Sequence, residues 1–280
     1  MPPGATPLSL PVIGLGTWRF GESRATRARE IAAVRVALEL GYRLIDTAEM
    51  YGEGGAEEVV GAALGEAFRA GDVRREDVVV VSKVYPRNAS RSGVREACDR
   101  SRHRLGLDAI DVYLLHWRGE GPLADTVAGM RALAAAGQIG RWGVSNFDVD
   151  DMNEVTAVEE GCALDQVWYS LGERGPEFAL LPWLRERGMP LMAYSPIDQG
   201  RAAADPVLGK IAAERRLTAV QVALARLLAE PGVVAIPKAS SEAHLRENLQ
   251  AAELQLSTEE LRSIDGRFPR PSRKAPLAMN

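Results

Sequence analysis

Four side chains that can donate, accept or stabilise a proton lie at the ends of three successive apolar runs. Asp46 and Tyr51 belong to the run RLIDTAEMYG. Lys83 closes VVVVSK, and His116 closes DVYLLH. A phenol with a pKa of about 10 is a weak acid at neutral pH unless a nearby cation favours its ionised form. A tyrosine, a lysine, a carboxylate and a histidine brought together therefore predict a proton-transfer site.

Within such a site the four residues have complementary roles. Lys83 can supply the cation that stabilises a phenolate. A buried lysine needs a partner of opposite charge, and Asp46 is the candidate. His116 can then hydrogen-bond a substrate carbonyl and orient it. Each role depends on the others, so the set is more informative than any single member.

The elements that must position these residues follow from the periodicity of the chain. Continuous apolar runs are typical of strands covered on both faces. We expect eight of them, at 13–17, 43–47, 78–83, 110–116, 142–145, 166–169, 190–194 and 233–237. Helical spacing fills the gaps, and glycines such as Gly41 and Gly106 follow helix ends. Eight strand–helix units in about 250 residues predict an α/β fold, a closed (β/α)₈ TIM barrel. An open, doubly wound sheet is the alternative, because periodicity does not show closure.

Additional helices are expected near the C-terminal end of the barrel. Two of them, 205–216 and 219–229, lie between the last two predicted strands, and 258–265 follows the final barrel helix. Ser257 suits an N-cap, with Glu260 completing a capping box. Such helices can shape a phosphate or ligand site, or can simply cover the barrel. No Pro/Gly/Ser-rich linker interrupts the chain, so we expect a single domain over residues 1–280.

Charge and composition argue against several classes of partner. The net charge is -4 and no block of like charge occurs, so neither nucleic acid nor an anionic membrane surface is an expected partner. Four basic residues gather near the C-terminus among prolines, and we interpret them as a solvated tail: Arg267, Arg270, Arg273 and Lys274.

The cysteines and the N-terminus indicate a cytoplasmic protein. Cys98 and Cys162 are far apart and have no CxxC spacing, which fits a reducing compartment. His116 has no His or Cys near it at ligand spacing, so no metal site is expected. The run MPPGATPLSLP lacks a signal peptide's basic start, and no apolar run approaches the ~20 residues that span a bilayer. We expect a monomer.

A family resemblance rests on seven motifs in order over nearly the whole chain: GLGTW, RLIDTAEMYGEGGAEEVVG, SKVYP, IDVYLLHW, GRWGVSNF, LMAYSP and IPKASS. They resemble the signature of the aldo-keto reductase family, most specifically over 41–61. The resemblance implies a (β/α)₈ barrel that transfers hydride between a nicotinamide cofactor and an aldehyde or ketone. It makes Tyr51 the general acid and His116 the residue that positions the carbonyl. Lys83, salt-bridged to Asp46, would lower the pKa of the tyrosine.

The cofactor site implied by the resemblance is on the C-terminal face of the barrel. No GxGxxG sequence opens a helix here, so a Rossmann half is not expected. Ser145, Asn146 and Gln166 would hydrogen-bond the nicotinamide carboxamide. The ring of Tyr194 would stack on the nicotinamide, and Ser195 belongs to the same cofactor-binding set.

Phosphate recognition is expected after the last strand, in IPKASS. Lys238 and Ser240 can meet a 2′-phosphate, together with the free N–H groups of the helix that follows. In the same pattern Asn248 would contact adenine. His244 stands where many NADPH-dependent members carry an arginine, and a histidine is mostly neutral at pH 7. We therefore expect NADPH as the cofactor, with NADH possible because discrimination is weakened.

The substrate pocket is expected to be lined by Trp18, Tyr85 and Trp117, beside Tyr51 and His116. The short, Pro-rich C-terminus leaves little material for a deep specificity loop. We therefore predict an open pocket, an NADPH-dependent reductase of small aldehydes, dicarbonyls or sugar-derived aldehydes, and a small-molecule carbonyl as the partner.

Two other functions are kept as alternatives. The chain could be a redox-sensing regulatory module, like the channel β subunits that resemble this family. The complete set of four residues and the lack of a tetramerising extension speak against that. Lys83 could instead form a Schiff base, as in barrel aldolases, but the adjacent tyrosine and the nicotinamide-site residues argue against it.

Overall fold

The computed structural model describes residues 8–279, and most of the N-terminal run used for the signal-peptide expectation lies outside them. Its centre is an eight-stranded parallel sheet in which each strand pairs with the next one along the chain. The strands are β1 Leu15–Gly16, β2 Leu44–Asp46, β3 Val79–Val84, β4 Ile110–Leu115, β5 Ile139–Ser145, β6 Asp165–Trp168, β7 Leu191–Tyr194 and β8 Val233–Ala235. Each predicted strand is present, although several are shorter than expected because their ends turn into loops.

The sheet closes on itself between its last and first strands. Ile13 forms a parallel bridge with Ala235, and Gly16 forms one with Lys238. The backbone N–H of Gly14 donates to the carbonyl of Ala235 at 2.8 Å. A Cβ at Gly16 would lie 2.6 Å from the carbonyl oxygen of Ile236, so glycine is required for this close approach. The closed barrel is confirmed, and the open-sheet alternative is excluded.

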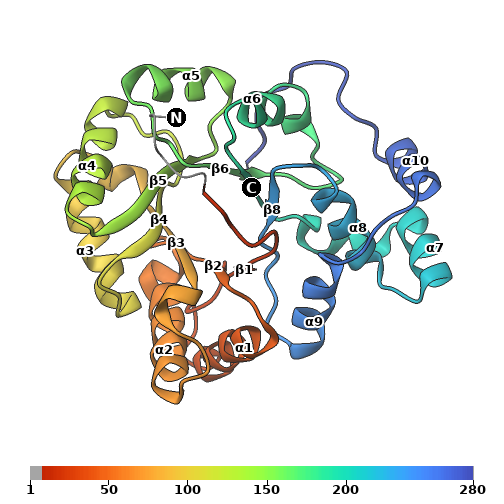
Figure 1. The fold of residues 1–280 in the computed structure, drawn as a ribbon, viewed down its shortest axis with the longest axis horizontal. Helices are drawn as coiled ribbons and strands as arrows, with labels where there is room; N and C mark the ends of the chain where they lie inside the picture. The colour runs from red at the N-terminus through yellow and green to blue at the C-terminus, as the bar shows by residue number, and fades with distance from the viewer. Residues whose placement is uncertain (1–7, 280) are drawn as a thin grey trace.

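Helices form a ring around the barrel, as Figure 1 shows. They are α1 Arg27–Leu40, α2 Gly55–Ala70, α3 Gly93–Leu105, α4 Leu123–Ala135, α5 Val149–Val158, α6 Leu180–Glu186, α7 Pro206–Arg215, α8 Ala219–Leu228, α9 Glu242–Ala251 and α10 Thr258–Arg267. The additional helices fall where the sequence predicts them. Ser257 caps α10 and Glu260 completes the capping box. None of the helices between residues 8 and 279 is long and apolar enough to cross a membrane.

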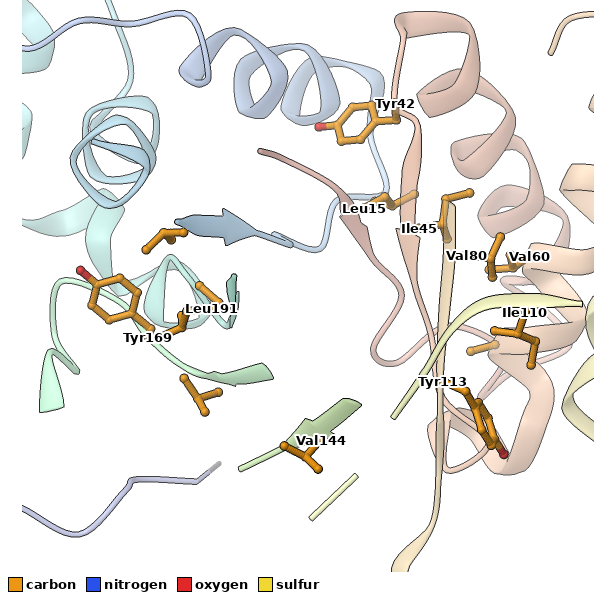
Figure 2. Close-up of a cluster of buried hydrophobic side chains, with 14 of the residues drawn as sticks. Leu15, Tyr42, Ile45, Val60, Val80, Ile110, Tyr113, Val144, Tyr169 and Leu191 are labelled. Carbon is orange, nitrogen blue, oxygen red and sulfur yellow. The ribbon is translucent and has the colours of Figure 1, made fainter. Parts of the chain in front are cut away.

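Buried apolar side chains form two main layers because strand residues alternate between the faces of the sheet. Leu44, Val81, Val112 and Met192 belong to the cluster that fills the barrel interior. A larger cluster packs the outer face of the strands against the helices. Figure 2 shows members of this outer layer, with Val80 of β3 beside Val60 of α2. The filled interior leaves the carboxyl ends of the strands as the place for a site.

The basic residues of the C-terminal tail form ion pairs that the sequence interpretation did not include. Arg267 pairs with Asp205 at 2.8 Å, Arg270 pairs with Glu230, and Lys274 pairs with Asp150 at 2.8 Å. Figure 1 shows the tail returning from α10 toward the centre of the ring. These three side chains are exposed, as the interpretation of a solvated tail expects, but each is also ion-paired with a distant carboxylate. Their acidic partners lie far away in the sequence, so charge spacing alone could not reveal them.

Candidate active site

The four predicted proton-transfer residues meet at the carboxyl ends of the strands. Asp46 ends β2, Lys83 is the fifth residue of β3, and His116 directly follows β4. Asp46 lies opposite Val81 in the β2–β3 register. Lys83 lies two residues further along β3, so its side chain projects from the same face of the sheet as that of Asp46. Tyr51 opens a short 3₁₀ helix in the loop after β2.

Lys83 connects the carboxylate to the phenol. Its Nζ lies 2.8 Å from Asp46 Oδ2, and it also donates to the carbonyl oxygen of Thr47 at 2.8 Å. A third donation, 3.3 Å long, reaches the hydroxyl of Tyr51. An ammonium has three N–H donors, and all three have acceptors here. Lys83 is fully buried, which leaves no free amine for a Schiff base.

The pKa of Tyr51 lies well above its ordinary value of 10 because the protein desolvates the phenolate, and the charge of Asp46 raises it further. This direction is opposite to the lowering expected from Lys83 alone. Burial disfavours the charged phenolate and the carboxylate of Asp46 disfavours it further, so the nearby ammonium does not bring the pKa below its ordinary value. Tyr51 therefore holds its proton at neutral pH, which is the state a proton donor must have.

Gln166 supports the carboxylate from the opposite side of the barrel. Its Nε2 donates to Asp46 Oδ1 at 2.7 Å, so β6 is connected to β2 across the interior. An ionised carboxylate only accepts hydrogen bonds, which requires the amide nitrogen to face Asp46. The carbonyl oxygen of Gln166, whose side chain lines the cavity, is then available to accept a bond from a ligand.

His116 is a neutral side chain beside the phenol. Its ring lies 5.7 Å from that of Tyr51 in an edge-on arrangement. Burial lowers the pKa of His116 well below 6.5, and the charge of Lys83 adds to the shift. Its Nδ1 is buried without a hydrogen-bond partner. A neutral imidazole can orient a carbonyl oxygen by donating one hydrogen bond.

The predicted nicotinamide residues form a connected chain. Ser145 donates to the backbone carbonyl of Gln166 at 2.7 Å, and Asn146 donates to the carbonyl of His116 at 3.1 Å. The hydroxyl of Tyr194 donates to Asn146 Oδ1 at 2.9 Å. Asn146 has a positive φ of 61°, an uncommon conformation that is enriched at functional sites.

One cavity of about 450 Å³ joins these groups, a size typical of small-molecule sites. Its lining includes the predicted residues Trp18, Asp46, Tyr51, His116, Trp117, Asn146, Gln166, Tyr194, Ser195 and Lys238. Lys83 lies beneath it. Tyr85 is outside the lining but packs edge-on against Trp117, with ring centroids 5.0 Å apart. The cavity thus brings most of the predicted residues to one space.

Three residues predicted to bind the 2′-phosphate end and the adenine of the cofactor are not part of the cavity. Ser240, His244 and Asn248 lie outside the cavity lining. His244 is exposed and its backbone N–H is bound by the N-cap Ser241, whereas Asn248 is buried. Contact of these three residues with a nucleotide therefore stays a prediction.

Sequence reasoning missed several lining residues. Met50, Met279 and Arg19 line the cavity, as does the loop from Pro196 to Gly200 after β7. Met50 immediately precedes Tyr51, so its place in the sequence could have indicated that it lines the cavity. Met279 reaches the mouth only because the tail folds back, which no local pattern shows. Among residues 8–279 no group of three His, Cys, Asp or Glu side chains is placed to hold a metal ion.

Asp46, Lys83, Tyr51 and a neutral His116 at the mouth of a closed barrel form a proton-transfer site. The sequence model of the aldo/keto reductase family matches residues 12–267. The chain belongs to this family, which confirms the resemblance and the class of carbonyl reductase it implies.

Particular relatives cover nearly the whole chain. Methylglyoxal reductase YeaE from Escherichia coli is 47% identical over 279 residues, which are 97% of this chain and 96% of the relative. Methylglyoxal reductase DkgB from Escherichia coli O157:H7 is 30% identical, with 92% of each chain covered. An aldo-keto reductase from Klebsiella pneumoniae, solved in complex with NADPH, is 46% identical. It superposes with a TM-score of 0.91 over 97% of this chain and 95% of its own.

Proposed function

We propose that this protein is an NADPH-dependent reductase of small aldehydes and dicarbonyls such as methylglyoxal, with Tyr51 as the proton donor. The observation that carries the proposal is the bond between Lys83 and the hydroxyl of Tyr51, together with the ion pair to Asp46. Two relatives named as methylglyoxal reductases support the substrate class.

The residues present fit a nicotinamide dinucleotide. The carbonyl oxygen of Gln166 is an acceptor suited to the N–H of a carboxamide, and Tyr194 offers an aromatic ring beside it. Lys238 also lines the cavity and has no ion pair within the described chain. The Klebsiella pneumoniae relative was solved with NADPH. When bound, the reduced nicotinamide supplies the hydride for the carbonyl carbon.

The chain's own residues handle the proton and the carbonyl oxygen. His116, as a neutral imidazole, holds the oxygen beside the phenol. Tyr51 then donates its proton to that oxygen as the alcohol forms. The phenolate left behind is stabilised by the ammonium of Lys83, and Asp46 keeps that ammonium in place. Gln166 in turn holds the second oxygen of Asp46. Reprotonation of Tyr51 completes the cycle.

The shape of the cavity supports a small substrate. Trp18, Met50 and Trp117 line it beside Tyr51 and His116, and Met279 lies on the tail that returns to the mouth. These apolar and aromatic walls suit short aldehydes, whose carbonyl then reaches Tyr51 and His116. A marked preference for a bulky ketone over short aldehydes would contradict this part of the proposal.

The experiment that tests the proposal follows the oxidation of NADPH at its absorbance maximum with methylglyoxal and glyceraldehyde, then with NADH in place of NADPH. We expect clear turnover with both aldehydes. NADPH should be preferred only moderately, because His244 replaces the arginine that would clamp the 2′-phosphate. Binding of NADPH without reduction of any carbonyl in a broad panel would favour the regulatory module instead.

We further propose a single-domain, monomeric protein of the cytoplasm. The free thiols of Cys98 and Cys162, both buried, fit a reducing compartment. Sedimentation of the purified chain would test the oligomeric state.

A further inference from the structure

A second polar cluster lies on the outer side of β3, behind Lys83, and the proposed mechanism does not use it. Ser82 precedes Lys83 in the strand, so its side chain projects from the opposite face, toward the surrounding helices. Its Oγ donates to Glu57 Oε1 at 2.5 Å. Glu57 lies in the first turn of α2 and is fully buried. A carboxylate is costly to bury unless partners satisfy it, so this position calls for a specific role.

The second partner of Glu57 is a cation that also supports the loop of Tyr51. Arg104, in the last turn of α3, donates from Nε to Glu57 Oε2 at 2.6 Å. Helices α2 and α3 are neighbours in the ring (Figure 1). A Cβ at Gly54 would lie 2.6 Å from Arg104 Nε, so the guanidinium packs directly against the backbone there. Gly54 ends the short 3₁₀ helix that Tyr51 opens. Glu57 and Arg104 together therefore join β3, α3 and this loop.

The Tyr51 loop needs support from outside itself. The residues that follow Tyr51 are left-handed: Gly52 has a φ of 55°, Glu53 of 54° and Gly54 of 94°. Glu53 is not glycine, and its Cβ makes this conformation unfavourable. Such conformations persist only where the surrounding structure fixes them. The position of the tyrosine therefore depends on contacts between its loop and neighbouring elements.

Two carboxylates supply contacts of this kind, one on each side of Tyr51 in the sequence. Glu49, whose side chain is 8% exposed, accepts the backbone N–H of Tyr85 at 2.7 Å. Tyr85 directly follows β3. Glu57 accepts from the serine that precedes Lys83. The segment that carries Tyr51 is thus attached to β3 both before and after the lysine.

The charge of Glu57 also acts on Lys83. Burial lowers the pKa of the lysine, the charge of Asp46 opposes this shift, and Glu57 adds to the opposition from behind the strand. The other titratable groups that face the ammonium are the hydroxyl of Tyr51 and the neutral ring of His116. Glu57 therefore helps to keep Lys83 in its charged form.

Two more titratable side chains lie within electrostatic reach of Glu57. They are Cys98 of α3 and Tyr113 of β4. Burial raises the pKa of both, and the charge of Glu57 adds to the rise, so both keep their protons at neutral pH. The counter-ion of Glu57 in this cluster is therefore Arg104.

We propose that Glu57 is a positioning residue for proton transfer, which holds the hydroxyl of Tyr51 against Lys83 and keeps a negative charge behind the lysine. The inference rests on the proposed function, in which Tyr51 is the proton donor. Ser82 and Arg104 act through Glu57: the first links it to β3, and the second balances its charge. Glu57 touches no substrate and acts only through the tyrosine and the lysine.

The test compares Glu57→Gln with Glu58→Gln as a matched control. Glu58 lies in the same turn of α2 and pairs with Arg27 at 2.9 Å, but its side chain is half exposed. Glutamine has nearly the shape of glutamate, with one acceptor oxygen and no charge. We expect kcat with methylglyoxal to fall by about 10- to 100-fold in Glu57→Gln, the scale for a misplaced reacting group. KM and the affinity for NADPH should be unchanged, and Glu58→Gln should match the wild type throughout.

Proton measurements separate this role from a purely structural one. Removing the negative charge lowers the pKa of Lys83, so the alkaline limb of kcat/KM should move to lower pH in Glu57→Gln. The titration of Lys83 should move in the same direction, followed by NMR of isotope-labelled lysine with Lys83→Met to assign the signal. Ser82→Ala keeps the charge but loses the hydrogen bond, so it should lower kcat and leave both titrations in place.

The inference is overturned if Glu57→Gln matches Glu58→Gln in kcat. It is also overturned if kcat falls while Lys83 titrates as in the wild type, because that leaves a structural role only. If Glu57→Gln does not fold, Ser82→Ala decides, and a wild-type kcat in that variant contradicts the inference. Failure of the proposed function is a separate result, since the wild type would then reduce no aldehyde. The NMR titration still decides in that case whether Glu57 acts on Lys83.

Discussion

Two ionic clusters in this barrel differ in structure and in what their charged groups can do. One is the relay at the barrel mouth, where Lys83 and Asp46 form a single ion pair next to Tyr51. The other lies under the tail, where charged side chains from several elements are interconnected: Arg174, Glu177, Arg226, Glu230 and Asp265. In the distal cluster each of these side chains is paired with another member of the cluster. The mouth cluster ends at a cavity, where His116 Nδ1 has no partner.

The pKa values of Glu230 in the distal cluster and of Asp46 at the mouth shift in opposite directions. Burial alone would raise the pKa of Glu230, but hydrogen bonds from Arg185 and Arg226 and the charge of Arg270 lower it overall. At Asp46 burial has the larger effect and the pKa is raised despite Lys83. Several cations thus fix the distal charges, whereas the mouth retains groups that can exchange a proton. We infer that the distal cluster serves stability and the cluster at the mouth serves catalysis.

The largest effect should come from Lys83→Met. We expect kcat/KM to fall at least about 100-fold, the usual scale for losing assisted proton transfer. The variant should also lose stability, because Asp46 is left buried without its counter-ion.

Adding Asp46→Asn to Lys83→Met separates these two effects. The double variant should recover much of the unfolding free energy, measured with urea, but no activity. Recovery of activity in the double variant would show that the ammonium itself is not needed.

In the distal cluster, Arg174→Met should reduce stability but leave activity unchanged. Arg174 is buried and contacts Glu177 at 2.6 Å and Asp265 at 2.7 Å. Its removal should lower the free energy of unfolding by about 3–5 kcal/mol, since the buried carboxylate of Glu177 loses its nearest cation. At a temperature where the variant is folded, kcat/KM should equal that of the wild type. A loss of activity in folded protein would contradict the division of roles.

The pH dependence of stability should show His116 as a buried neutral group. Its folded-state pKa lies well below the ordinary 6.5, so below pH 6.5 the unfolded chain binds a proton that the folded protein does not. Stability therefore falls as the pH drops, by up to about 2 kcal/mol between pH 6.5 and 5 from this group. Urea unfolding of His116→Asn should lack that component. His103→Asn, at an exposed position on α3, is the control and should behave as the wild type.

The smallest effect is expected at the start of α10, the helix that carries Asp265 into the distal cluster. The Ser257 side chain accepts a hydrogen bond from the N–H of Glu260. Ser257→Ala should lower the unfolding free energy by about 1 kcal/mol, the usual value of an N-cap, without changing kcat/KM. A change in cofactor binding in this variant would indicate that α10 contributes to the site.

Local patterns predicted the elements and the ends of the strands well. The apolar runs located all eight strands, and the Ser257 capping box predicted the start of α10. The start of β5 was missed, because Gly140 interrupts the apolar run although Ile139 pairs with Ile110. α6 begins at Leu180, after a 3₁₀ turn at Gly175–Glu177 that the periodicity of the sequence does not show.

What depends on the closed barrel could not be read from the sequence. The bond from Gln166 to Asp46 joins residues on opposite strands of the barrel. The raised pKa of Tyr51 follows from the burial of its hydroxyl in the assembled structure. The tail that brings Met279 to the cavity also forms ion pairs with residues distant in the sequence, such as that of Lys274 with Asp150. The motifs identified the reacting groups, but their electrostatics required the assembled structure.

The most direct measurement compares wild type with Tyr51→Phe in NADPH-dependent reduction of methylglyoxal, with NADPH affinity measured alongside. The phenylalanine keeps the ring but removes the hydroxyl that Lys83 contacts. We expect NADPH to bind with nearly unchanged affinity and the reduction rate to fall by about 100-fold or more. A variant that binds NADPH and reduces methylglyoxal at the wild-type rate would show that Tyr51 is not the proton donor.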